Sequence, residues 1–193
     1  MNKSFWKNKK ILVTGHTGFK GSWLSLWLDY LGADVIGLSL EPPTKKNLYT
    51  KAKIKTKILS LRGDIRDYKV VRSVIKKYKP DIIFHLAAQA LVLDSYKLPL
   101  ETYQTNVLGS QNVIDACLHE NVETVVCVGT DKAVSPLNTY GATKLLMEKL
   151  FVTANNYTDH ERHRTKFIAI RYGNVLGSSG SVVPTSVKQI ESG

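Results

Sequence analysis

The sequence has 193 residues, with 27 lysines and arginines against 16 aspartates and glutamates, and a formal net charge of +11. With 43% hydrophobic residues, 22% charged residues and two cysteines, it has the composition of a globular domain. This excludes a disordered chain, a collagen-like repeat and a disulfide-stapled mini-protein, and the basic charge leaves nucleic-acid binding as a hypothesis to test.

Short apolar runs alternate with helical patterns along the chain. The apolar runs predict strands over 11–13, 34–40, 58–61, 82–86, 124–128 and 167–171. Helical spacing predicts helices over 23–31, 70–78, 101–120, 140–155 and 182–190. The lysine-rich segment 45–57 has no clear period. This alternation predicts an α/β fold with a doubly wound parallel sheet of Rossmann type, whose strands are joined by crossover helices.

The start of the chain does not have the pattern of a targeting segment. Residues 1–10 are basic, but the apolar run that follows is short and stops at Thr14, which favours a strand over a secretory signal. No uncharged apolar stretch approaches the roughly 18 residues that a membrane span needs. Cys117 and Cys127 lie in apolar segments without a Cys-x-x-Cys pattern, which indicates two buried, reduced thiols. We therefore expect a cytoplasmic protein with no membrane association and no metal site.

A glycine-rich turn follows the first predicted strand. Gly15, Gly18 and Gly21 stand in G-x-x-G-x-x-G spacing directly before a helix. This spacing suits a tight turn, a close approach of the backbone to a pyrophosphate, and close packing of the helix on the strand. Main-chain amides and the positive end of the helix dipole then face the phosphates. We therefore expect a dinucleotide site here, with Thr17 and Phe19 among its contacts.

The ends of the second and third strands carry the candidate contacts for adenosine. Ser39 can hydrogen-bond a ribose or a 2′-phosphate, Glu41 stands further out, and no arginine clearly marks NADP. The choice between NAD and NADP therefore stays open. Asp64 and Ile65 are placed to meet the adenine, although Asp64 is equally well placed to cap the next helix.

A tyrosine and a lysine stand four residues apart in the helix that follows the fifth strand. Tyr140 and Lys144 share one helix face, and Thr130 ends the preceding strand. The carboxyl ends of parallel strands line the ligand crevice of such a sheet. A nearby ammonium favours a tyrosinate, so we expect Lys144 to lower the pKa of Tyr140 and Thr130 to share the proton path.

These features together resemble the extended, nucleotide-sugar-modifying branch of the short-chain dehydrogenase/reductase superfamily, over essentially the whole chain. Residues 15–24 and 40–44 are similar to CDP-glucose 4,6-dehydratases, whereas residues 130–144 and 171–184 are similar to inverting UDP-N-acetylglucosamine 4,6-dehydratases. We give the later segments more weight because they contain the residues that touch the sugar. The resemblance implies further cofactor contacts from Ala87, Ala88, Gln89, Asn106, Tyr140, Lys144 and Tyr172, and a substrate contact from Asn174.

The resemblance also implies a mechanism. Tyr140, as tyrosinate, takes the proton of the sugar 4-hydroxyl while a hydride passes to the nicotinamide, and Lys144 holds the nicotinamide ribose. Lys132 then removes the C5 proton and Asp131 protonates the departing 6-hydroxyl, so that water leaves and the hydride returns to C6. Without the resemblance, adjacent Asp131 and Lys132 would indicate a solvated ion pair on a surface turn.

The predicted function is therefore a nucleotide-sugar 4,6-dehydratase that uses NAD or NADP and acts on UDP-N-acetylglucosamine for surface polysaccharide or glycan biosynthesis. A CDP-glucose 4,6-dehydratase and a nucleotide-sugar 4-epimerase are the alternative enzymes. A cofactor-binding regulatory protein or a nucleic-acid-binding protein is the alternative from another class. Nucleic acid is disfavoured because the lysine-rich segments lack interleaved aromatic residues.

The resemblance divides the sequence into two parts. Residues 1–177 are assigned to an NAD(P)-binding Rossmann domain, and residues 178–193 to the start of a truncated substrate-binding region. The substrate domain is then largely absent from this sequence, so we expect the chain to bind dinucleotide and to turn substrate over poorly. We also expect a homo-oligomer.

Overall fold

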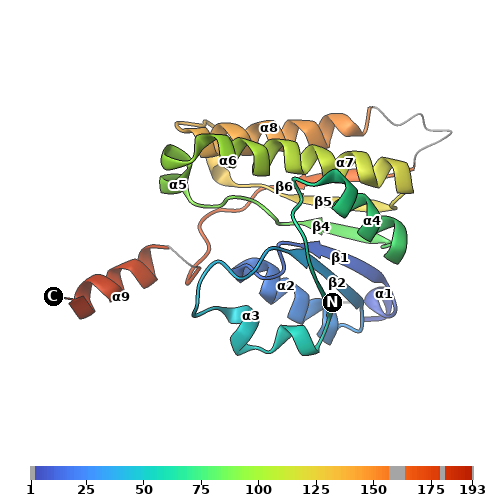
Figure 1. Cartoon of the computed structure of the whole chain (residues 1–193), viewed down its shortest axis with the longest axis horizontal. Coiled ribbons are helices and arrows are strands. Elements are labelled where there is room, and N and C mark those ends of the chain that lie inside the picture. Colours follow the sequence, from blue (N-terminus) through green and yellow to red (C-terminus); the bar gives the residue numbers. More distant parts are fainter. Residues whose placement is uncertain (1–2, 157–163, 179–180, 193) are drawn as a thin grey trace.

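A computed structural model describes residues 3–156, 164–178 and 181–192. Six parallel strands form one sheet in the order β3-β2-β1-β4-β5-β6, which confirms the predicted doubly wound sheet of Rossmann type (Figure 1). The strands are β1 (Lys10–Thr14), β2 (Asp34–Ser39), β3 (Leu59–Arg62), β4 (Ile82–His85), β5 (Thr124–Val128) and β6 (Lys166–Ile170). The winding reverses between β1 and β4, where a ligand crevice opens in folds of this type.

Helices cover both faces of the sheet. Helices α4, α7 and α8 pack against one another on one face, and α2 and α3 lie on the other (Figure 1). The α-helices are α1 (Lys3–Trp6), α2 (Phe19–Tyr30), α3 (Leu48–Lys51), α4 (Tyr68–Tyr78), α5 (Val92–Lys97), α6 (Pro99–Tyr103), α7 (Gly109–Glu120), α8 (Thr139–Ala154) and α9 (Val182–Ser192). Within the described residues, no helix is long and apolar enough to cross a bilayer.

The helix predicted over 101–120 is in fact two helices joined by a wider turn. Helix α6 ends at Tyr103, a π-helical turn η2 (Gln104–Leu108) follows, and α7 then continues to Glu120. A π-turn adds a residue to the helical circuit and often marks a functional position. Here the turn contains Asn106, which is completely buried. Apolar spacing alone did not predict this turn. The apolar residues before and after it follow nearly the same helical spacing, so the sequence pattern resembles that of one continuous helix.

The lysine-rich segment 45–57 contains structure that its sequence period did not predict. Asn47 caps α3 by accepting a hydrogen bond from the Thr50 amide, and a 3-10 turn η1 (Ile54–Thr56) follows. The segment is held by two buried side chains, Tyr49 and Ile54. Two buried side chains are too few to form a periodic pattern in the sequence. Helices α1 and α5 were not predicted for a similar reason, because each is too short to show a helical period.

The sheet has an apolar layer on each face. Neighbouring residues of a strand point to opposite faces, so Leu12 joins the core beneath α4, α7 and α8 while Ile11 and Val13 join the core beneath α2 and α3. Cys117 and Cys127 are buried, unpaired thiols of the first layer, as predicted. The two layers make the sheet a rigid platform for the loops at its carboxyl edge.

A buried hydrogen-bond chain joins β1 to β4 and α7. The Ser110 hydroxyl donates to the Asn106 carbonyl oxygen (2.7 Å), so the His85 Nε2–H donates to Ser110 Oγ (2.9 Å). His85 Nδ1 then accepts from the Thr14 hydroxyl (2.8 Å). These bonds require a neutral ring. Burial, with a smaller contribution from the charge on Lys144, lowers the pKa of His85 to about 3.

Removing the largest buried side chain tests the core. Phe151 is fully buried, stacks on the His85 ring at 5.5 Å and meets the Phe167 ring edge-on at 6.0 Å. We expect Phe151→Ala to lower the free energy of unfolding by about 3–5 kcal/mol, because it leaves a cavity. Val152→Ala, at the exposed neighbouring position, should change it by less than about 0.5 kcal/mol. Urea unfolding followed by circular dichroism measures both, and equal effects would contradict this packing.

Acid should destabilise the fold through His85. Between pH 6.5 and 3 the unfolded chain binds a proton on this ring that the folded chain does not, so stability falls as the pH falls. The contribution of one such group to the slope is at most about 1.4 kcal/mol per pH unit. Urea midpoints from pH 7 to pH 4 should show a shallower slope for His85→Gln than for the unmodified chain. Identical slopes would show that the ring is protonated in the fold.

Candidate functional site

The glycine turn between β1 and α2 is packed so closely that side chains are excluded. A Cβ at Gly15, where φ is +77°, would lie 2.7 Å from the Ala87 amide nitrogen, and a Cβ at Gly21 would collide with the Gly15 carbonyl. Gly18 is the N-cap residue of α2, and only the Gly15 oxygen, at 3.3 Å, lies near its Cβ position. The turn therefore presents bare backbone at the start of a helix, a cradle that fits a pyrophosphate.

The predicted contacts beside this turn lie close together. The Thr17 hydroxyl donates to the Leu40 carbonyl oxygen (3.0 Å) and so accepts from the Ser39 hydroxyl (2.7 Å). This links the turn to the end of β2 and already engages the Ser39 hydroxyl within the chain. Phe19 begins α2, with its ring 4.0 Å from the Cβ position of Gly177.

The interpretation of Asp64 as the cap of the next helix is wrong. Asp67 caps α4 through the amides of Lys69 and Val70. Asp64 accepts instead from the Arg66 amide and guanidinium, at 2.9, 2.8 and 2.6 Å. The Ile65 side chain is buried in the core. Only its main chain is then left to face an adenine.

Asn106 is placed as a positioning residue. Its side chain accepts from the Gln89 amide (2.9 Å) and donates to the Gln89 carbonyl (3.2 Å) and to the Thr143 hydroxyl (3.1 Å). The Thr143 hydroxyl in turn donates to the Tyr140 carbonyl (2.9 Å). Asn106 therefore ties the loop after β4, which contains the partly exposed Ala87 and Ala88, to the helix that carries Tyr140.

The loop after β5 brings the catalytic candidates together. The 3-10 turn η3 (Asp131–Ala133) packs against the first turn of α8, where a Cβ at Gly141 would lie 2.6 Å from the Lys132 carbonyl oxygen. Asn138 caps α8 by accepting from the Gly141 amide (2.8 Å). The Thr130 hydroxyl donates to Asp131 Oδ1 (3.0 Å). Thr130 and Tyr140 are both buried, and the Thr130 side chain acts on the pKa of Tyr140.

Asp131 and Lys132 form an ion pair that reaches the loop after β6. Lys132 Nζ lies 3.1 Å from Asp131 Oδ1 and donates to Asn174 Oδ1 (2.9 Å). The hydrogen bonds from Lys132 and Thr130 lower the pKa of the Asp131 carboxyl. The Lys132 ammonium therefore donates to a carboxylate. It brings Asn174, the predicted substrate contact, next to the two proton-transfer candidates.

The expected effect of Lys144 on Tyr140 is not what the structure shows. Lys144 is buried, its ammonium donates to the Val128 carbonyl (3.1 Å) and lies 3.2 Å from the Met147 sulfur, and burial lowers its pKa to about 8. Burial raises the pKa of Tyr140, and the Thr130 side chain opposes this rise. Spacing of i and i+4 places both residues on one face but does not determine where a long lysine side chain ends.

Lys20, in the first turn of α2, is a second ammonium near Lys144. Its Nζ lies 3.4 Å from the centre of the Tyr172 ring, and burial, together with the charge of Lys144, lowers its pKa to about 8. The Tyr172 carbonyl accepts from the Asp131 amide (2.9 Å). Arg171 and Glu148 hold this loop by two hydrogen bonds of 2.7 Å. Local sequence could not predict the contact of Lys20 with Tyr172, because Tyr172 lies 152 positions later.

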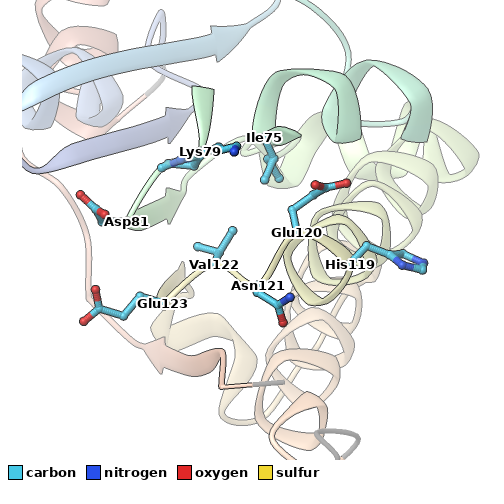
Figure 2. A pocket seen from close by; sticks show the side chains of 9 residues that line it. Ile75, Lys79, Asp81, His119, Glu120, Asn121, Val122 and Glu123 are labelled. Atoms are coloured by element: carbon cyan, nitrogen blue, oxygen red, sulfur yellow. The ribbon is translucent and has the colours of Figure 1, made fainter. Parts of the chain in front are cut away.

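A hollow at the opposite edge of the sheet contains none of these residues. Figure 2 shows its lining at the amino ends of β4 and β5, with Asp81, Glu120 and Glu123 among the side chains. The chemistry of parallel sheets lies at the carboxyl edge. The candidate site is therefore the crevice over the glycine turn and not this hollow.

Comparisons with known proteins show the family of this chain. A family model described as polysaccharide biosynthesis protein matches residues 11–193. CDP-glucose 4,6-dehydratase from Salmonella typhimurium is 37% identical over 197 residues, covering 92% of this chain and 55% of that protein. An inverting UDP-N-acetylglucosamine 4,6-dehydratase from Campylobacter jejuni is 37% identical over 198 residues, covering 97% of this chain and 55% of that protein.

Solved structures show the same fold. Pen from Bacillus thuringiensis superposes with a TM-score of 0.87 at 35% identity, covering 97% of this chain and 57% of that one. UDP-glucose 4-epimerase from Brucella ovis, in complex with NAD, has a TM-score of 0.73 at 26% identity, covering 86% of this chain and 52% of that one. The chain thus spans about half the length of these relatives. It belongs to the polysaccharide biosynthesis protein family, among the extended short-chain dehydrogenase/reductases.

Proposed function

We propose that this chain is the cofactor-binding half of an NAD(P)-dependent nucleotide-sugar 4,6-dehydratase, a lyase of polysaccharide or glycan biosynthesis. The observation that carries the proposal is the Asp131–Lys132–Asn174 cluster beside Thr130 and Tyr140. A 4-epimerase needs the tyrosine but has no use for a second pair of groups with opposite proton tasks. UDP-N-acetylglucosamine is the proposed substrate, and CDP-glucose is the alternative.

The residues at the carboxyl edge fit a nicotinamide dinucleotide. The bare backbone of the glycine turn suits its pyrophosphate, and Tyr140, Lys144 and Tyr172 would hold its nicotinamide end. Such a cofactor supplies a hydride acceptor for C4 of the sugar and returns the hydride at C6. Tyr140 takes the proton of the 4-hydroxyl.

The Asp131–Lys132 pair then performs the elimination. The roles require a proton on Asp131, to protonate the departing 6-hydroxyl, and a free amine on Lys132, to take the proton from C5. The resting pair has the opposite distribution, so its proton must cross the 3.1 Å contact before reaction. Asn174 accepts from Lys132 and so orients the amine while it changes charge.

Several wider expectations belong to the same proposal. Residues 178–193 would begin the substrate-binding region, although 179–180 and 193 lie outside the described residues; α9 within it extends away from the sheet (Figure 1). The buried, unpaired Cys117 and Cys127 suit a reducing compartment, which supports a cytoplasmic location. A nucleotide-sugar partner and a homo-oligomer complete the proposal.

Cofactor binding and product analysis test the proposed function. We expect isothermal titration of the 193-residue chain to show binding of a nicotinamide dinucleotide. Long incubation with cofactor and UDP-N-acetylglucosamine or CDP-glucose should form a 4-keto-6-deoxy sugar, which has lost water and absorbs in alkali. An epimerised product of unchanged mass would favour the 4-epimerase. Absence of dinucleotide binding would overturn the proposal.

Exchange at C5 tests the base. In deuterium oxide, Lys132→Ala should lower deuterium incorporation at C5 by about a hundredfold or more, because the amine that takes the proton is gone. Dinucleotide affinity should remain unchanged. Lys166→Ala, at an exposed lysine of β6, is the matched control and should exchange normally. Undiminished exchange in Lys132→Ala would show that another group removes this proton.

A further inference from the structure

The ends of β2 and β3 carry an ion pair that the proposed reaction does not use. Ser39 and Arg62 are partners in the sheet register, and Arg62 Nε lies 2.5 Å from Oε1 of Glu41, two residues beyond β2. The Glu41 side chain is 76% exposed and that of Arg62 is 35% exposed. An isolated pair this exposed contributes little to stability, so stability alone does not account for it.

The Arg62 guanidinium is connected to the glycine turn through the side chains of Ser60 and Tyr49. Its Nη1 donates to the Ser60 hydroxyl and its Nη2 to the Tyr49 hydroxyl, both at 3.4 Å, and its carbon lies 5.2 Å from the Tyr49 ring centre. The Ser60 hydroxyl also bonds the Tyr49 hydroxyl (2.7 Å) and His16 Nε2 (2.8 Å). His16 belongs to the glycine turn and is completely buried. The guanidinium therefore has a set position relative to that turn.

The ends of β2 and β3 are where a dinucleotide bound at the turn would place its adenosine ribose. In Rossmann-type sheets the ribose lies at the end of the second strand, where an acidic side chain binds its 2′-hydroxyl or an arginine binds a 2′-phosphate. The Ser39 hydroxyl is already engaged with Thr17. The charged groups presented at this end are then Glu41 and Arg62, joined to each other.

We propose that Glu41 and Arg62 form a selectivity pair that makes the chain prefer NAD to NADP, with the Glu41 carboxylate occupying on Arg62 the place of a 2′-phosphate. This inference rests on the proposed function, since it concerns the same cofactor. The carboxylate accepts hydrogen bonds from ribose hydroxyls, whereas a 2′-phosphate must displace it from Arg62 against like-charge repulsion. The positive charge of Lys55 also acts on Glu41. Neutralising Glu41 therefore leaves Arg62 without its carboxylate.

Titration of both dinucleotides into charge variants tests the pair. The unmodified chain should bind NAD about tenfold or more tighter than NADP, and Glu41→Gln should strengthen NADP binding by about tenfold or more. Adding Arg62→Met to Glu41→Gln should abolish that gain. Glu120→Gln is the matched control, because it removes the Arg72–Glu120 pair (3.0 Å) between α4 and α7 and should leave the preference unchanged. Circular dichroism confirms that each variant is folded.

The outcomes separate this inference from the function on which it rests. NADP binding as tight as NAD in the unmodified chain, an unchanged preference in Glu41→Gln, or a gain that survives Arg62→Met would each overturn the selectivity pair. The cofactor proposal would stand in all three cases. If neither dinucleotide bound to the unmodified chain, the proposed function and the selectivity pair would both be overturned.

Discussion

The hydrogen bonds of the Thr14 hydroxyl hold together the two strands between which the winding of the sheet reverses. This hydroxyl donates to His85 Nδ1 and accepts from the amides of Leu86 and Ala87, at 3.2 Å each. Gly15 then turns against the Ala87 backbone, and a side chain there would force the strands apart. The crevice depends on this contact, because the glycine turn and the loop after β4 form its two walls.

The remaining parts of the site are fastened to the same walls. Asn106 joins the loop after β4 to Thr143 and so to the helix that carries Tyr140. The Tyr172 main chain joins the loop after β6 to Asp131. Each link runs through backbone or buried amide groups, which have few alternative geometries. The ionisable groups are thus held by elements that do not titrate, while the Asp131–Lys132 pair stays exposed enough to exchange its proton.

The electrostatics of the crevice follow from its cationic side chains. Lys20 and Lys144 both lose proton affinity to burial, and Lys20 loses more to the charge of Lys144. Bringing like charges together costs free energy unless an anion accompanies them. A phosphate-bearing ligand supplies such an anion. The positive charge of the sequence, +11 overall, is therefore also present locally at the site, in Lys20 and Lys144. This supports the proposed dinucleotide and nucleotide-sugar ligands.

The sequence by itself determined the strands, the glycine turn, and the placement of Thr130, Tyr140 and Asp131 at one sheet edge. These depend on local periods and on residues close together in the chain, so their pattern is visible without coordinates. The π-turn at Asn106 and the short helix at Asn47 have too few anchors to form a period. Only the tertiary structure decided which distant side chains meet. Lys20 reaches Tyr172, Lys144 turns to Val128 and Arg62 meets Glu41, because long charged side chains are directed by whatever the packing brings within reach.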